Sequence, residues 1–116
     1  MIAKKLVGEY FLLFPDKRDF FIQKWLQSQN IWLQRSTLLF QLGYKKSTDS
    51  HLLFDLIIRL KEIDAFFIQK AIGWSLREYS KSNPDQVMQF IKKHDLSALS
   101  RKEGMKYLRK LDHYDT

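Results

Sequence analysis

The stretch that decides the fold is Ala65-Phe-Phe-Ile-Gln-Lys-Ala-Ile-Gly-Trp-Ser-Leu-Arg-Glu-Tyr-Ser80, in which apolar residues recur at helical spacing. Asp64, directly before it, is placed to cap this helix. Asn83-Pro84 follow, and an asparagine cap with proline at the first helical position predicts another helix over 84–93, with Gln86 as a capping-box partner. Two helices joined by so short a connection make antiparallel neighbours. The stretch therefore predicts an all-α fold built from helix pairs.

Helix start and stop signals continue toward both ends of the chain. Pro15 stops a first helix, Asn30 is placed to cap the third, and Gly43 ends that third helix. Besides 65–80 and 84–93, helices are expected over residues 2–13, 17–27 (with Asp16 as a cap), 31–42, 47 or 48 to 61, and 100–111, the last opened by a capping box at Ser100. This gives about seven helices in one domain, residues 1–111, and a frayed tail over 112–116. The second and third, fourth and fifth, and sixth and seventh helices pair naturally, and the first is left over.

Internal similarity between the helices favours a repeat architecture. Trp32-Leu-Gln-Arg35 and Trp74-Ser-Leu-Arg77 share a Trp-x-x-Arg pattern, and Phe20-Phe-Ile-Gln-Lys24 recurs identically as Phe66-Phe-Ile-Gln-Lys70. Both spacings lie near the repeat length of HEAT and armadillo proteins, about 40–47 residues. Only the Trp-x-x-Arg pattern places equivalent helices of two pairs in register. The sequence therefore favours a HEAT-like α-α superhelix of stacked antiparallel helix pairs, with an isolated helical bundle as the alternative.

The composition indicates a folded, basic protein. Aromatic residues make up 15% of the 116 residues, too many for a disordered chain, and the formal net charge is +7. Such a charge favours a polyanionic partner, chiefly nucleic acid, although a basic surface without a partner is the competing interpretation. The sequence shows no signal peptide and no apolar run long enough to span a bilayer, so we expect a cytoplasmic protein without membrane association.

Signals for catalysis or metal binding are weak. Cysteine is absent, which excludes disulfides and thiolate ligands. The three histidines, His51, His94 and His113, stand apart in the sequence without partners at metal-ligand spacing. No Gly-rich phosphate loop and no nucleophile motif is recognisable. We therefore expect no metal, no cofactor and no active site formed by these residues alone.

The residues best placed to bind an anion belong to the second helices of the predicted pairs. Trp74, Arg77 and Lys81 fall on one face of a helix, and Trp32 and Arg35 share a face in the same way. Second helices line one surface of a HEAT solenoid, and the concave basic wall expected there consists of Arg35, Lys45, Lys46, Arg77 and Lys81. Arginine binds phosphate through bidentate hydrogen bonds, and a neighbouring indole can contact a sugar or base. Core packing is nevertheless the more common role of a tryptophan at helical spacing.

Two further features have a structural and a functional interpretation. Gly73 inside a helix costs about 1 kcal/mol relative to alanine, which favours close approach of a neighbouring helix over close approach of a ligand. A second candidate basic patch, for which a solvated helix face is the simpler explanation, consists of Arg101, Lys102, Lys106, Arg109 and Lys110.

Five segments of the chain are similar to one known family. They are Gly8-Glu-Tyr-Phe11, Ile31-Trp-Leu-Gln-Arg35, Phe40-Gln-Leu-Gly-Tyr-Lys45, Phe67-Ile-Gln-Lys-Ala-Ile-Gly-Trp-Ser-Leu-Arg-Glu-Tyr-Ser80 and Ser97-Ala-Leu-Ser-Arg-Lys102. They resemble the DNA alkylation repair (AlkD-like) family, and the resemblance is most specific over 67–80. It implies a HEAT-like α-solenoid that binds double-stranded, alkylated DNA. It also implies glycosylase chemistry, in which N3- or N7-alkylated purines are released by cleavage of the N-glycosidic bond.

The resemblance carries over to individual residues only in part. Arg35 matches the family arginine that faces the DNA at the lesion, and Trp74 matches an aromatic residue of the cleft that receives the damaged nucleotide. The family's catalytic aspartate and a companion tryptophan belong to a Trp-Asp-x-Val-Asp segment just before the helix that begins here at Met1, and that segment is absent from the 116 residues. We therefore expect the DNA-binding C-terminal half of the fold, with little or no base excision on its own.

Two other functions remain open at this point. One is a HEAT-like module that binds protein and has no nucleic-acid activity. The other is an enzyme completed by the missing half, supplied by another chain or by self-association. Half a solenoid leaves an apolar end exposed, so we expect association through the end that carries the first helix.

Overall fold

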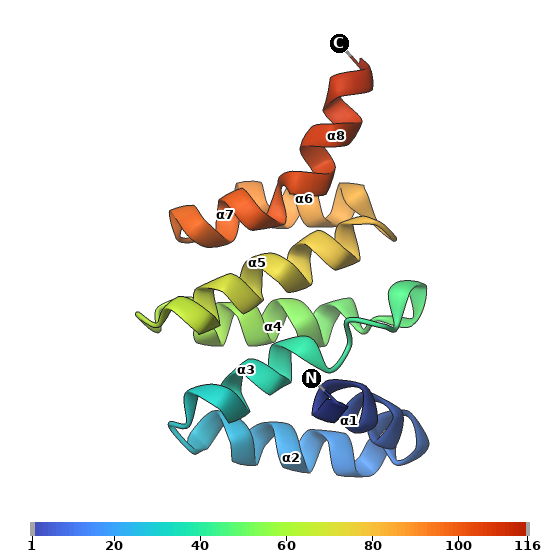
Figure 1. The fold of residues 1–116 in the computed structure, drawn as a ribbon, viewed down its shortest axis with the longest axis vertical. Helices are drawn as coiled ribbons and strands as arrows, with labels where there is room; N and C mark the ends of the chain where they lie inside the picture. Colours follow the sequence, from blue (N-terminus) through green and yellow to red (C-terminus); the bar gives the residue numbers. More distant parts are fainter. Residues whose placement is uncertain (1, 116) are drawn as a thin grey trace.

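The computed structural model describes residues 2–115, and the side chains of residues 8–111. The described chain contains eight α-helices and one short 3-10 helix (Figure 1). Their bounds are α1 Ile2–Leu13, α2 Pro15–Gln27, α3 Ile31–Leu39, η1 Lys45–Ser47, α4 Ser50–Leu60, α5 Phe66–Ser80, α6 Pro84–Lys93, α7 Ala98–Gly104 and α8 Lys106–Asp115. No strand occurs within the described residues, which confirms the all-α prediction.

The helices stack in two layers along the longest dimension of the molecule, which measures 45 × 30 × 24 Å (Figure 1). The first helices α2, α4 and α6 form one layer. The second helices α3, α5 and α7 form the other, in which α5 packs against both α3 and α7. Helix α1, left over in the predicted pairing, packs against α2, and α8 extends beyond α7 at the other end of the stack. The second helices therefore present one continuous surface, as the helix-pair prediction requires.

Two predicted caps are confirmed by their hydrogen bonds. The Asn30 side-chain oxygen accepts from the backbone N–H groups of Trp32 and Leu33, at 2.9 and 3.2 Å. The Asn83 side-chain oxygen accepts from the backbone N–H of Gln86 at 3.2 Å. Both caps satisfy donors that a helix N-terminus would otherwise leave unpaired.

Four predicted helix boundaries are wrong. Helix α2 begins at Pro15 because proline fits the first helical turn, and Asp16 lies inside the helix. Helix α3 ends at Leu39, three residues early, and Gly43 does not end it, because residues 40–44 form turns in which the Leu42 N–H donates to the Leu39 carbonyl at 3.1 Å. Asp49 caps α4 by accepting from the Leu52 N–H at 3.1 Å, in place of Ser47 or Thr48. The N-cap of α5 is Ala65, which has no capping side chain, so Asp64 does not cap it.

The C-terminal segment also differs from its prediction. Ser97 caps α7 by accepting from the Ser100 N–H at 3.1 Å, so Ser100 lies within the helix and is buried. A break at Met105 divides the expected single helix into α7 and α8, which raises the number of α-helices to eight. Helix α8 continues to Asp115, where a frayed tail was predicted from Asp112 onward, and Thr116 lies outside the described residues.

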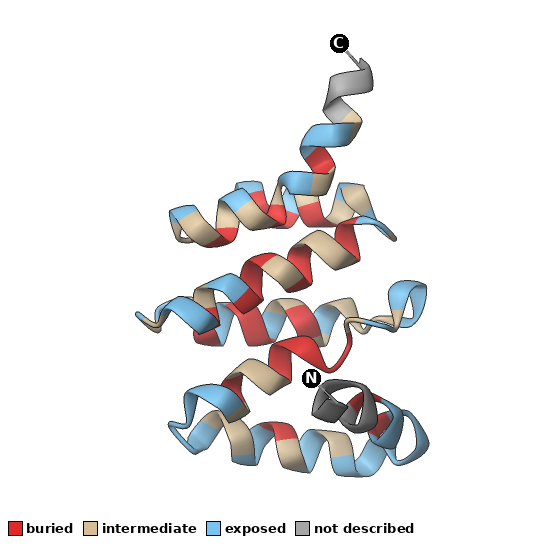
Figure 2. Cartoon of the chain, in the orientation of Figure 1, coloured by how far each residue is buried: buried red, intermediate tan, exposed pale blue. Residues whose placement is uncertain are grey.

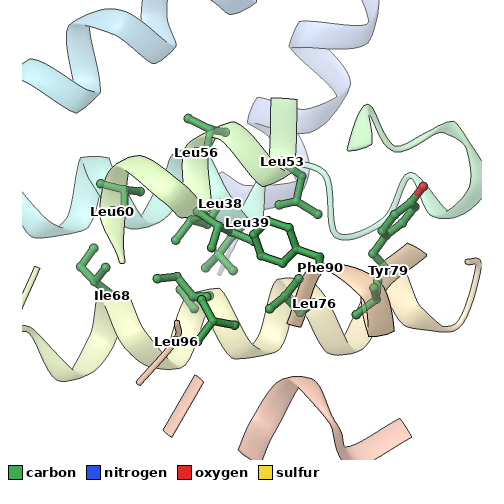
Figure 3. Packing of buried hydrophobic residues seen from close by; sticks show 14 of the residues in the cluster. Leu38, Leu39, Leu53, Leu56, Leu60, Ile68, Leu76, Tyr79, Phe90 and Leu96 are labelled. Carbon is green, nitrogen blue, oxygen red and sulfur yellow. The ribbon is translucent and has the colours of Figure 1, made fainter. Parts of the chain in front are cut away.

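The hydrophobic core lies between the layers, with α5 at its centre (Figure 2). Ile68, Ile72 and Leu76 are each 0% exposed. Full burial of such a side chain stabilises the fold by about 1.5–3 kcal/mol. Figure 3 shows these helices contributing side chains to one cluster, with Leu38 and Leu39 from α3 facing residues of α4, α5 and α6.

Helices α5 and α7 approach closely because small residues lie where they cross. A Cβ atom added to Gly73 would lie 2.5 Å from the Cβ of Glu103 and 3.0 Å from the carbonyl oxygen of Ser100. The Ser100 hydroxyl donates to the backbone carbonyl of Gln69 at 2.8 Å. Close helix packing therefore accounts for Gly73.

Candidate nucleic-acid interface

The surface of the second helices carries the predicted stripe of α5. Trp74 and Arg77 are half-buried, and Lys81 at the end of the helix is exposed. The Lys81 ammonium lies 3.3 Å from the Glu78 carboxylate, one turn earlier. Lys81 is therefore held near the helix surface by an exposed ion pair, a contact worth at most about 1 kcal/mol.

The turn after α3 brings two more lysines to the same end of α5. Lys45 and Lys46 are both exposed in η1, and Lys45 has a positive φ of 55° that reverses the chain. These two lysines and Lys81 line one cavity of about 630 Å³. The structure thus brings three of the five predicted wall residues together from two segments of the chain.

A second cavity of about 580 Å³ adjoins the lysine-lined one. Trp74 lines it, and Tyr44 and Glu78 line both cavities. The indole of Trp74 also packs against the hydrophobic core, so its packing role and its cavity-lining role coexist. The two cavities form a groove with lysines at one end and an indole at the other, and we call it the α1–α5 groove.

Helix α1 forms the far wall of this groove, contributing Gly8 and Glu9 among its lining residues. The Tyr44 hydroxyl donates a hydrogen bond to the Gly8 carbonyl, which ties α1 to the turn after α3. A Cβ on Gly8 would lie 2.6 Å from the Phe40 carbonyl oxygen, so the close approach requires glycine. Burial raises the pKa of the Tyr44 hydroxyl, and the positive charge of Arg18 partly offsets that rise.

Neither of the two predicted arginines lines either cavity. Arg35 is half-buried on α3, the helix next to α5. Arg77 lies on the side of α5 toward α7, near enough to Glu103 for its positive charge to stabilise the ionised Glu103 carboxyl. The hydrogen bond from Lys106 lowers the pKa of the Glu103 carboxyl, burial opposes this, and the charges of Lys70 and Arg77 lower it further. The predicted single wall thus divides into a lysine cluster and two arginines on adjacent helices.

Sequence reasoning missed the carboxylates of this surface. Glu78 was detectable, since its position three residues before Lys81 predicts an ion pair on one helix face. Glu9 and Tyr44 were not detectable as groove residues, because their positions depend on how α1 packs against distant segments. Glu9 lines only the indole end of the groove, whereas Glu78 lines both cavities and pairs with Lys81.

The second basic patch, at the C-terminal end, is partly neutralised. Lys106 pairs with Glu103 at 3.0 Å, and the Arg101 guanidinium donates to the Ile91 carbonyl at 3.4 Å. The break at Met105 also distributes these basic residues over two helices. These contacts support the interpretation of a solvated helix surface.

The described residues contain no group of three or more His, Cys, Asp or Glu side chains that could hold a metal ion. None of the helices over residues 2–115 combines the length and the apolar character needed to cross a bilayer.

Comparison with known families matches residues 1–108 to the DNA alkylation repair enzyme family. The chain belongs to the DNA alkylation repair family. A solved structure titled as a predicted DNA alkylation repair enzyme from Enterococcus faecalis is similar, with a TM-score of 0.79 and 40% sequence identity. The similarity covers 87% of this chain and 47% of that one, so the chain spans about half the length of that family member. No curated protein matches the sequence.

Proposed function

We propose that these residues form the DNA-binding C-terminal portion of a DNA alkylation repair glycosylase, built as a HEAT-like superhelix. The observation that carries the proposal is the convergence of Lys45, Lys46 and Lys81 on one end of a groove whose other end holds Trp74. Lysine ammonium groups bind DNA phosphates, and an indole packs against a sugar or a base. Membership of a DNA repair family makes DNA the partner that fits this arrangement.

The DNA-binding surface proposed here also includes the two arginines that lie outside the cavities. Arg35 and Arg77 extend the positive surface across α3 and α5, and a double-stranded partner is wide enough to contact both helices. We call Arg35, Lys45, Lys46, Arg77 and Lys81 the basic wall.

Salt dependence tests the binding proposal. For a protein that neutralises several phosphates of duplex DNA, log affinity falls with log salt concentration with a slope of about −0.9 per contact. We expect a steep slope in fluorescence anisotropy with a labelled duplex, and Arg35→Ala weakens binding. A flat salt dependence, or no binding, would favour the alternative function, a HEAT-like protein-interaction module.

The proposal assigns binding but little excision to the 116 residues alone. Cleavage at an alkylated purine develops positive charge on the sugar, and the family's carboxylate that stabilises it belongs to the Trp-Asp-x-Val-Asp segment absent here. Preorganised electrostatic groups of this kind contribute about 100- to 1000-fold in rate. Purified chain incubated with DNA containing N7-methylguanine should release almost no free base. Efficient release by a preparation free of full-length homologues would contradict this assignment.

The end of the stack that carries α1 and α2 is the proposed self-association surface. Large apolar side chains there are exposed: Leu12 at 60%, Leu13 at 74%, Phe14 at 50% and Phe20 at 62%. An exposed apolar patch of this kind favours association with a second copy or with a complementary half of the fold. Sedimentation velocity at increasing concentration should show a dimer, and a species that stays monomeric would count against the surface. Excision restored on adding a separate N-terminal half would show that another chain completes the enzyme.

A further inference from the structure

Three exposed aromatic rings meet at the N-terminal ends of α3 and α5. Trp32 is 57% exposed, Phe66 56% and Phe67 46%. The centres of the Trp32 and Phe67 rings lie 5.1 Å apart, and those of Phe66 and Phe67 lie 5.3 Å apart. We call these three residues the aromatic platform.

The core does not account for the platform, as the repeated pentapeptide shows. Phe-Phe-Ile-Gln-Lys occurs at 20–24 on α2 and at 66–70 on α5, and the isoleucine of each copy is buried in the core. On α2 the second phenylalanine, Phe21, is half-buried against Phe11 of α1, with ring centres 6.2 Å apart. On α5 the equivalent Phe67 stays exposed beside Trp32. The same sequence thus packs inward in one copy and leaves an aromatic surface in the other.

Positive charges flank the platform and connect it with the basic wall. The Lys70 ammonium lies 5.6 Å from the centre of the Phe66 ring, a cation–π contact. Arg35 follows Trp32 by one helical turn, and Trp74 follows Phe67 by two turns on the same face of α5. Each of the two helices therefore places a cation within one turn of the platform, and one face of α5 leads from the platform to the indole of Trp74.

We propose that the aromatic platform stacks unpaired bases of single-stranded DNA that adjoins the duplex held on the basic wall, an inference that rests on the proposed function. Proteins bind single strands by combining a basic track for the backbone with aromatic rings that stack on bases. Bases within a duplex are already stacked on their neighbours, so the platform acts only where the strand is unpaired. The flanking cations make nucleic acid a better fit than an apolar protein surface.

The test compares three labelled DNAs by fluorescence anisotropy: a blunt duplex, the same duplex with a short single-stranded overhang, and that duplex with an abasic overhang. The abasic overhang keeps the phosphates and removes the bases, so it separates stacking from charge. We expect the normal overhang to strengthen binding about tenfold, because stacking of a base on an aromatic ring contributes about that factor, and the abasic overhang to have little effect.

Two variants and one matched control localise the effect. Trp32→Ala and Phe67→Ala should each abolish most of the preference for the normal overhang and leave binding to the blunt duplex unchanged. Ile58→Ala removes an exposed apolar side chain from α4, in the other layer, and should leave the preference intact. Circular dichroism confirms that each variant is folded.

Three results would overturn the inference. Equal affinity of the unmodified chain for blunt and overhang duplexes would refute the platform while leaving duplex binding in place. Equal strengthening by normal and abasic overhangs would assign the effect to phosphates. If Trp32→Ala abolishes self-association but keeps the preference for the overhang, the aromatic platform binds a second copy of the chain and not DNA. Failure to bind any of the three DNAs would instead contradict the proposed function on which the inference depends.

Discussion

At the scale of the single residue, Glu78 is the group that most directly opposes anion binding in the α1–α5 groove. Its carboxylate lies 3.3 Å from the Lys81 ammonium and lines both cavities. Glu78→Gln removes a negative charge next to the proposed phosphate site and releases Lys81. We predict duplex affinity about two- to fivefold higher, on the scale of one exposed ion pair. Anisotropy titration measures this, with Glu62→Gln, which also faces a lysine, as the matched control.

A second residue-scale prediction concerns pH. The hydrogen bond from Lys106 lowers the pKa of Glu103 below its ordinary value of 4.5. Because the folded-state pKa is the lower one, the stabilisation is fully present above the unfolded pKa and is lost as the pH falls through the folded pKa. Glu103→Gln should therefore lower the melting temperature near neutral pH, and the difference should shrink in acid as the Glu103 carboxylate is protonated. The difference should be small, because an ion pair of this exposure is worth at most about 1 kcal/mol. A difference that stays constant down to about pH 3 would show that the charge of Glu103 does not contribute.

The sequence could predict which side chains lie near one another only where the pairing of helices decides it. Lys45, Lys46 and Lys81 line one cavity because two helix ends that meet in a paired fold bring them together, and their role in DNA binding stays a prediction. Arg35 and Arg77 were placed in the same wall by the same logic, but neither lines the cavities. The position of α1 across the groove from α5 had no local signal in the sequence.

At the scale of the helix, the crossing of α5 and α7 gives the sharpest prediction. Gly73→Ala gains about 1 kcal/mol of helix propensity but forces a Cβ to 2.5 Å from the Glu103 Cβ. We predict a net loss of about 1–3 kcal/mol in the free energy of unfolding, the usual cost of overpacking. Gly43→Ala is the control, since no atom lies within 4 Å of its added Cβ, and it should be neutral or slightly stabilising. Urea denaturation of both variants measures the difference. Equal stability of the two would contradict the close approach.

Helix boundaries were predictable where a side chain caps its own helix and not where tertiary packing sets the end. Asn30 and Asn83 cap as their positions indicate. Ser100 has the spacing of a cap but is buried inside α7, where its hydroxyl bonds to Gln69 of α5. A Cβ atom added to Gly104 would lie 3.2 Å from the Cβ of Leu76, so a close approach to α5 accompanies the break that divides α7 from α8. Local spacing could not reveal a break that depends on another helix.

At the scale of the whole molecule, the two-layer stack brings Lys45 and Lys46, and Lys81 far from them in the sequence, to one cavity. Helix pairing places α3, α5 and α7 side by side, so residues far apart in the sequence share a face (Figure 1). The sequence predicted this architecture because its helix signals and its Trp-x-x-Arg repeat agree. Because of this arrangement, we propose that phosphates bind at the lysine end of the groove and that bases contact the indole of Trp74 and the aromatic platform.

The salt dependence of duplex binding in a matched pair of variants tests the central claim most directly. One variant replaces Lys45, Lys46 and Lys81 with alanine, and the other replaces the exposed Lys17, Lys24 and Lys92 of the first-helix layer, so both lose the same charge. If the basic wall binds DNA, the first variant should lose affinity and its log–log salt slope should become shallower by about 1 for each lysine that contacts a phosphate, while the control keeps the slope of the unmodified chain. Identical slopes for the two variants would contradict the account.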